Sequence, residues 1–205
     1  MGAMRQDRRT LAAAILGLPF LARTARAQTP PTRVVIETPA GTISLELYGD
    51  KAPITVANFM RYVDEKRFDG SVFYRVVNLP MPKPAGLIQA GAYGDPARVL
   101  PPIAHEPGSV TGLKHKDGTI SMARREPGSA TGEFFICVGD APYLDGNPIQ
   151  PGDNSGFAAF GKVIEGMDTV RAILAMPTSP TAGEAFGMKG QMLEPQVTMT
   201  VVRRA

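Results

Sequence analysis

Short β-prone runs, each ended by glycine, proline or aspartate, fill most of this chain and leave little room for helices. Eight of them occur, at residues 33–38, 42–48, 71–77, 86–91, 118–123, 133–139, 157–163 and 196–202. In two runs, as in "TISLELY", apolar residues alternate with polar ones, so one face of the strand is buried. The 22 glycines and 19 prolines supply the turns between the runs. The pattern predicts a mainly β domain.

Two stretches have helical spacing instead. Residues 51–68 place apolar side chains at i, i+3, i+4 and i+7, with Pro53 in the first turn, and this helix should end near Lys66. Residues 165–176 repeat the spacing and stop before Pro177. A parallel α/β sheet needs helices that alternate with its strands, and this chain has too few of them. We expect a closed eight-stranded antiparallel β-barrel, with two helices that cover its open ends.

The N-terminal segment has the parts of an export signal. It combines a basic start, an apolar stretch at residues 11–22 and the small-residue site Ala25-Arg26-Ala27. As a helix the apolar stretch would reach only about 18 Å, which is too short to span a bilayer. The pair Arg8-Arg9 resembles a twin-arginine signal, and an ordinary signal with two arginines is the alternative.

Removal of this signal changes the charge of the chain. Residues 1–27 hold five arginines and one aspartate, in a chain whose net charge is +3. The rest is close to neutral and has no basic stripe for nucleic acid. We therefore expect a signal at 1–27, a short linker at 28–32 and one domain at 33–205. The mature protein should be periplasmic, without membrane or nucleic-acid contact.

Most residue patterns that mark enzyme chemistry are missing. The single cysteine, Cys137, lies in an apolar run and is expected to be a buried thiol. With only two histidines, His105 and His115, a zinc site is not expected. No phosphate-binding, dinucleotide-binding or serine-nucleophile motif occurs. Hydrolases, kinases and dehydrogenases are therefore disfavoured, and neither a metal nor a cofactor is expected.

One arginine, Arg75, interrupts the apolar run 72–77. Regular alternation would place Phe73 and Val77 on its face of the strand. A guanidinium keeps its charge and its five donors, so among apolar groups it must have a partner or face a groove. The spacing leaves both hypotheses open: a structural ion pair with Glu133 or Asp95, or a charge that serves a binding site.

Several segments resemble those of the cyclophilins. They are "APITVANF", "FYRVV" followed by "LIQAG", "GTISMAR", "GSATGEFFICVGDAPYLDG" and "FAAFGKVIEGMDTV". They occur in the family's order across residues 33–202, which is nearly the whole of the expected domain. The resemblance implies a cyclophilin-like barrel and peptidyl-prolyl cis–trans isomerase activity. It also implies a monomer that acts on proline-containing polypeptides and needs no cofactor.

The resemblance also implies a role for particular residues. Arg75 would be the catalytic residue, which donates to the carbonyl oxygen and the nitrogen of a twisted prolyl amide, and Gln89 would orient it. His115 matches a groove-edge histidine of some members, and a surface turn residue is the alternative. The other residues expected to bind substrate are Tyr74, Ala123, Glu133, Tyr143 and, lining the proline pocket, Leu87, Phe135 and Leu144.

This chain departs from the family pattern at several of these positions. Tyr74 replaces a histidine, Glu133 replaces a glutamine, and Tyr143 stands where many members have tryptophan. Gly86 stands where an aromatic residue usually walls the proline pocket. The connection at residues 78–86 is longer than usual and rich in proline.

Two of these departures bear on the rate. Glu133 would compete with the substrate if it reached Arg75, or it would pair with Arg124 instead. The missing aromatic wall would loosen the pocket unless Leu79 or Met81 refilled it.

The leading hypothesis is an exported isomerase that speeds protein folding. The alternative is a low-activity module that holds proline-containing segments as a chaperone. A barrel that carries a small ligand would leave the matching segments unexplained.

Overall fold

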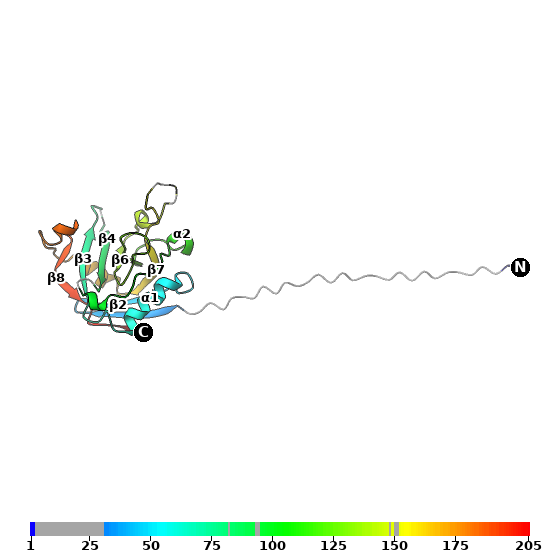
Figure 1. Ribbon diagram of the computed structural model, residues 1–205, viewed down its shortest axis with the longest axis horizontal. Coiled ribbons are helices and arrows are strands. Elements are labelled where there is room, and N and C mark those ends of the chain that lie inside the picture. Colours follow the sequence, from blue (N-terminus) through cyan, green and yellow to red (C-terminus); the bar gives the residue numbers. More distant parts are fainter. Residues whose placement is uncertain (3–30, 82, 93–94, 148, 150–151) are drawn as a thin grey trace.

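The computed structural model describes residues 1–2, 31–81, 83–92, 95–147, 149 and 152–205, so the expected export segment lies, apart from its first two residues, outside the described part. Within that part the chain forms nine strands and three α-helices. Figure 1 labels several of them. The strands are β1 (Thr32–Thr38), β2 (Gly41–Leu47), β3 (Val72–Asn78), β4 (Gly86–Gly91), β5 (Thr119–Met122), β6 (Phe134–Val138), β7 (Ala158–Glu165), β8 (Met192–Thr198) and β9 (Val201–Arg204). The helices are α1 (Pro53–Asp64), α2 (Gly108–Thr111) and α3 (Met167–Leu174).

The nine strands form one antiparallel sheet, in the order β8-β3-β4-β6-β5-β7-β2-β1-β9. Each run expected from the sequence forms a strand, but the last run is divided into β8 and β9. The division falls where the backbone changes partners. The N–H of Met199 donates to the Ser71 oxygen beside β3 at 2.7 Å, and the N–H of Thr200 donates to the Glu37 oxygen in β1 at 2.8 Å.

The C-terminal segment therefore supplies both end strands of the sheet, β8 beside β3 and β9 beside β1, and so curls it. No ladder joins β8 to β9 within the described residues. The fold is accordingly a curled sheet of nine strands, which corrects the expected closed barrel of eight. Helices α1 and α3 were both expected, whereas α2, a single turn of four residues, was not.

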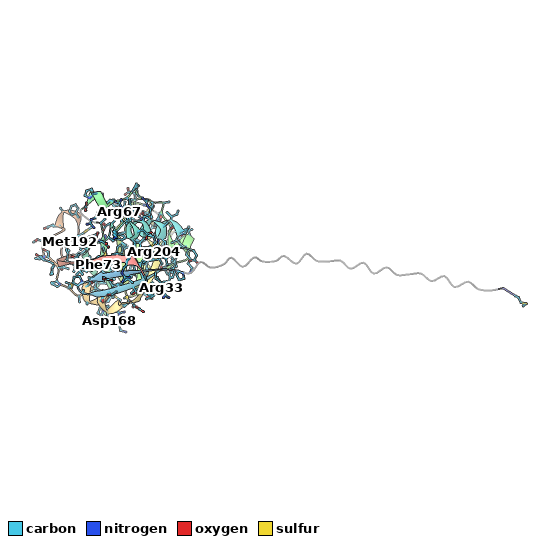
Figure 2. The ribbon with its side chains drawn as sticks, turned by 90° about the horizontal axis from the view of Figure 1, so that it is seen from below. Arg33, Arg67, Phe73, Asp168, Met192 and Arg204 are labelled. Atoms are coloured by element: carbon cyan, nitrogen blue, oxygen red, sulfur yellow. The ribbon has the colours of Figure 1, made fainter. Side chains whose placement is uncertain are left out.

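The core lies inside the curl, between the sheet and the two longer helices. Helix α1 packs against β7 and β9, and α3 packs against β2, β3, β4 and β6. Phe59 of α1 contacts the rings of Phe68, Phe134 and Phe160, at centroid distances of 5.1, 5.4 and 5.3 Å. Phe73 of β3, which is labelled in Figure 2, belongs to the same core. Because this side of the sheet is filled, a binding site must form on the outer side or at an end.

A buried carboxylate from a distant segment caps α1. Ala52, at the N-cap position, has no side chain that can accept a hydrogen bond, although the first N–H groups of a helix need acceptors. Glu106 supplies them. Its Oε1 accepts from the N–H of Ile54 at 3.2 Å, and its Oε2 accepts from the N–H and the hydroxyl of Thr55, both at 2.7 Å. Its negative charge also lies at the positive end of the helix dipole.

We expect Glu106→Ala to lower the free energy of unfolding by about 2 kcal/mol, because two N–H groups and a hydroxyl lose their acceptor in a buried place. Urea unfolding at pH 7 measures this change. Glu126→Ala, which removes an exposed glutamate, should change the free energy of unfolding by less than about 0.5 kcal/mol. Equal effects of the two substitutions would contradict the capping role.

Candidate active site

A β-bulge at Tyr74 turns two consecutive side chains to the outer face of the sheet. The pairing of β3 with both of its neighbours shifts between Phe73 and Arg75. Phe73 and Val76 belong to the core. Tyr74, Arg75 and Val77 line a cavity on the other face. The expected alternation, with Phe73 on the Arg75 face, is therefore wrong, because the extra residue of the bulge resets the phase of the strand.

Strand pairing aligns four side chains across four neighbouring strands. Arg75 of β3 lies opposite Gln89 of β4. Gln89 in turn lies opposite Phe135 of β6, and Phe135 opposite Ser121 of β5. Residues that are far apart in the sequence thus form one row, with a charge at one end and an aromatic ring near its middle.

Three members of this row, Arg75, Gln89 and Phe135, line a cavity of about 550 Å³ on the outer face of the sheet. The volume is that of a small-ligand site, and it suits a short segment of a peptide. The cavity brings together most of the residues expected from the sequence, namely Tyr74, Arg75, Leu87, Gln89, Ala123, Glu133, Phe135, Tyr143 and Leu144. The other lining residues are Val77, Leu79, Arg124, Arg125, Ser129, Thr131, Phe157 and Met188.

Two hydrogen bonds fix the Arg75 guanidinium. Its Nη1 donates to Gln89 Oε1 at 2.9 Å, and its Nε donates to Gln191 Oε1 at 2.8 Å. Nη2 has no acceptor among the described residues. Asp95, one of the ion-pair partners considered from the sequence, pairs instead with Arg98 at 2.9 Å. Burial lowers the pKa of Arg75, but a guanidinium remains charged at physiological pH. The site therefore presents a fixed cation with free donors.

Glu133 contacts neither Arg75 nor Arg124, the two partners considered for it. Its Oε2 accepts from the Tyr74 hydroxyl at 2.8 Å, and the Tyr74 oxygen accepts from Gln89 Nε2 at 2.6 Å. A continuous chain of hydrogen bonds thus runs from the guanidinium to the carboxyl group, with every donor directed toward Glu133. Burial raises the pKa of Glu133 to about 7, and the hydrogen bond from Tyr74 offsets part of that rise.

The apolar side of the cavity is a small cluster separate from the main core. Leu87, Phe135 and Leu144 form it together with Cys137 and Ala141. The ring of Phe157 meets Phe135 edge-on, with centroids 5.4 Å apart. Burial raises the pKa of the Cys137 thiol to about 12, so the thiol stays protonated and acts as an apolar group.

His115 lies neither at the groove edge nor in a surface turn. It is 1% exposed, and its ring stacks on Phe135 with centroids 6.0 Å apart. Its Nδ1 is 2.8 Å from Asp145 Oδ1, and its Nε2 is 2.9 Å from Ser121 Oγ. This Ser–His–Asp line cannot attack a substrate, because Ser121 is completely buried. It supports the Phe135 ring instead.

The cavity wall is built without the usual aromatic residue. Gly86 has a φ of +151°, and a Cβ atom there would overlap the Val77 carbonyl oxygen, so no larger residue fits. Leu79 and Met188 are among the lining residues. Met81 is 61% exposed and is not one of them. Of the two residues considered as replacements for the wall, Leu79 therefore reaches the cavity and Met81 does not.

Several residues of the site were not expected from the sequence, among them Phe157, Met188 and Gln191. Phe157 was assigned only to a strand, although its aromatic ring was a signal. Arg124 lies over that ring, 5.3 Å from its centroid, and pairs with Asp153 at 2.6 Å. Gln191 gave no local signal, because it joins the site only through the pairing of β8 with β3.

Within the described residues, no group of three His, Cys, Asp or Glu side chains is placed to hold a metal ion. No helix among those residues is long and apolar enough to cross a membrane. The polar side of the site is formed chiefly by four side chains, those of Tyr74, Arg75, Gln89 and Glu133.

The fold is similar to that of a solved cyclophilin. The cyclophilin type peptidyl-prolyl cis-trans isomerase of Cryptosporidium parvum superposes with a TM-score of 0.66 at 19% sequence identity, over 85% of this chain and 98% of that one. A second structure of that protein, determined in the presence of the dipeptide Ala-Pro, gives the same TM-score. The likeness shows that the chain has the cyclophilin fold.

Sequence similarity identifies the protein family to which the chain belongs. The model of the family described as "Cyclophilin type peptidyl-prolyl cis-trans isomerase/CLD" matches residues 33–200. A peptidyl-prolyl cis-trans isomerase of Acinetobacter baylyi is 39% identical over 152 residues, which cover 72% of this chain and 74% of that protein. Peptidyl-prolyl cis-trans isomerase A of Dickeya dadantii is 37% identical over 177 residues, or 84% and 87% of the two chains. The chain belongs to the cyclophilin type peptidyl-prolyl cis–trans isomerase family.

Proposed function

We propose that this protein accelerates rotation about Xaa-Pro bonds in other polypeptides, with Arg75 as the catalytic residue. The observation that carries the proposal is the Arg75 guanidinium, held at two nitrogens beside an apolar cavity while Nη2 stays free among the described residues. The Cryptosporidium parvum relative, whose structure was determined in the presence of Ala-Pro, supports a proline-containing ligand.

The chemistry requires no bond to be broken. Amide resonance resists rotation with a barrier of about 18–20 kcal/mol, and a prolyl bond populates both isomers but exchanges slowly. At the twisted transition state resonance is lost, so the carbonyl oxygen and the prolyl nitrogen both change their charge. A donor that is already fixed in place can stabilise this state more than either planar isomer. Arg75 Nη2 would be that donor.

The apolar cluster would hold the pyrrolidine ring. Leu87, Phe135 and Leu144 offer a surface without hydrogen-bonding groups, next to the guanidinium. Binding the ring there would leave the carbonyl before proline free to rotate. Tyr143, which is 56% exposed at the rim, would contact the residues that flank the proline.

Exchange NMR of a short Ala-Pro peptide tests the proposal. Catalytic amounts of protein should produce exchange between the cis and trans signals within a second, whereas free exchange takes tens of seconds or longer. Binding of the peptide without faster exchange would argue against an enzyme and favour a module that only holds proline-containing segments. A peptide with alanine in place of proline should show neither effect.

We also propose that residues 1–27 export the protein to the periplasm by the twin-arginine route, and that the domain acts there as a monomer on folding chains. The basic start and the Ala25-Arg26-Ala27 site support a cleaved signal. Replacement of both Arg8 and Arg9 by lysine should keep the protein in the cytoplasm, whereas Arg23→Lys should not. Unchanged export of the double variant would argue for an ordinary signal. A periplasmic protein that retains residue 1 would argue against cleavage.

A further inference from the structure

The turn before β8 reaches the catalytic arginine from a separate part of the chain. Gln191 stands directly before β8, and its Oε1 accepts the hydrogen bond from Arg75 Nε at 2.8 Å. Its backbone oxygen accepts from the N–H of Val76, also at 2.8 Å. One residue thus holds both the side chain of Arg75 and the backbone next to it, immediately after the bulge in β3.

This turn is itself held in place by its own hydrogen bonds. The N–H of Gln191 donates to the Met188 oxygen at 3.0 Å, and the N–H of Met188 donates to the Gly183 oxygen at 2.9 Å. Gly183 and Gly190 both have positive φ angles, of +80° and +73°, which glycine adopts without strain. Met188 also lines the same cavity as Arg75. The turn therefore contributes to the site at two points.

Two hydrogen bonds fix the orientation of the Arg75 guanidinium more completely than one would. The group is planar, and a single bond from Nη1 to Gln89 would still allow it to tilt about that bond. A second bond, from Nε to Gln191, fixes the plane and therefore the direction of the Nη2 donors. Small errors in donor placement reduce electrostatic catalysis strongly, because the donor must point to where charge develops.

We propose that the turn of residues 183–191 is a working part of the isomerase site, in which Gln191 is a positioning residue that sets the plane of the Arg75 guanidinium. This inference rests on the proposed function. Gln191 hydrogen-bonds Arg75 but does not line the cavity. We therefore expect it to affect the rate of turnover and not the binding of substrate.

Gln191→Met tests the proposal, since methionine has a similar size but only a weakly accepting sulfur in place of the amide oxygen that binds Nε. We expect the exchange rate of a saturating Ala-Pro peptide to fall about tenfold, while the peptide's dissociation constant changes less than twofold. The Arg75 Nε–H signal in the NMR spectrum should lose its protection from solvent exchange. Gln196→Met, on the exposed side of β8, is the matched control and should change none of these. A normal rate in Gln191→Met overturns the proposal.

A double-mutant cycle separates positioning from a general loss of structure. Lysine has no Nε–H of this kind, so Gln191→Met should have no further effect in an Arg75→Lys background. An equal loss in both backgrounds overturns the inference, because Gln191 would then act without Arg75. A normal rate in Arg75→Lys alone overturns the arginine mechanism itself. A slow Arg75→Lys beside a normal Gln191→Met overturns only the role of Gln191.

Discussion

Arg75→Ala should slow the catalysed exchange of an Ala-Pro peptide by at least about 100-fold, which corresponds to about 3 kcal/mol of barrier. The substitution removes the donor that is free to face the amide, but it leaves the apolar cluster of Leu87, Phe135 and Leu144 intact. The peptide should therefore still bind, with a dissociation constant within a few fold of that of the wild type. Exchange NMR at saturating peptide measures the rate, and titration of peptide chemical shifts measures the binding.

Two further variants make this result specific. Arg33→Ala removes an arginine of β1 whose side chain is 61% exposed, and it should leave the rate unchanged. Arg75→Lys keeps the charge but lacks the planar fork, so it should recover only part of the activity. An Arg75→Ala protein that turns over at the wild-type rate would mean that the cavity alone accelerates the rotation.

The sequence carried enough information for most of the fold, since the signals were local. The runs at 71–77 and 86–91 became β3 and β4, and the helical stripe at 51–68 became α1. The start of β8 was missed because Pro195, which lacks an N–H, argues against a strand interior. It is tolerated there because β8 lies at one end of the sheet order.

The positions of the site residues were harder to predict than their identities. The bulge at Tyr74 could not be seen in the sequence, since a regular strand would separate Tyr74 and Arg75 onto opposite faces. Gln191 and Glu106 act on residues far from them in the sequence, at 116 positions from Arg75 and 51 from Thr55. Such contacts depend on the tertiary fold, and no local sequence pattern predicts them.

The dependence on tertiary structure also explains why neither arginine considered for Glu133, Arg75 or Arg124, is its partner. Charge complementarity alone favoured an arginine, but the strand pairing places the Tyr74 hydroxyl between Glu133 and Gln89. The carboxyl group is therefore compensated by a neutral donor, which does little to offset its burial. As a consequence Glu133 titrates near neutral pH without an ion pair.

Glu133→Gln should remove a pH-dependent loss of stability. Burial raises the pKa of this carboxyl from 4.5 to about 7, so the folded protein binds one proton more than the unfolded chain between those values. The free energy of unfolding contributed by Glu133 therefore falls as the pH rises from about 5 to about 8, by up to about 3 kcal/mol. Glutamine cannot ionise, and its amide oxygen can still accept from Tyr74. The variant should match the wild type at pH 5 and exceed it at pH 8.

Urea unfolding of both proteins at pH 5, 6, 7 and 8 measures the difference, in which the titration of all other groups cancels. Glu126→Gln, at an exposed glutamate, should run parallel to the wild type across the whole range. Parallel curves for Glu133→Gln as well would show that Glu133 ionises freely in the folded protein. The rate of isomerisation should not rise in Glu133→Gln through release of Arg75, because Glu133 does not touch the guanidinium. A large gain in rate would show that it reaches Arg75 during turnover.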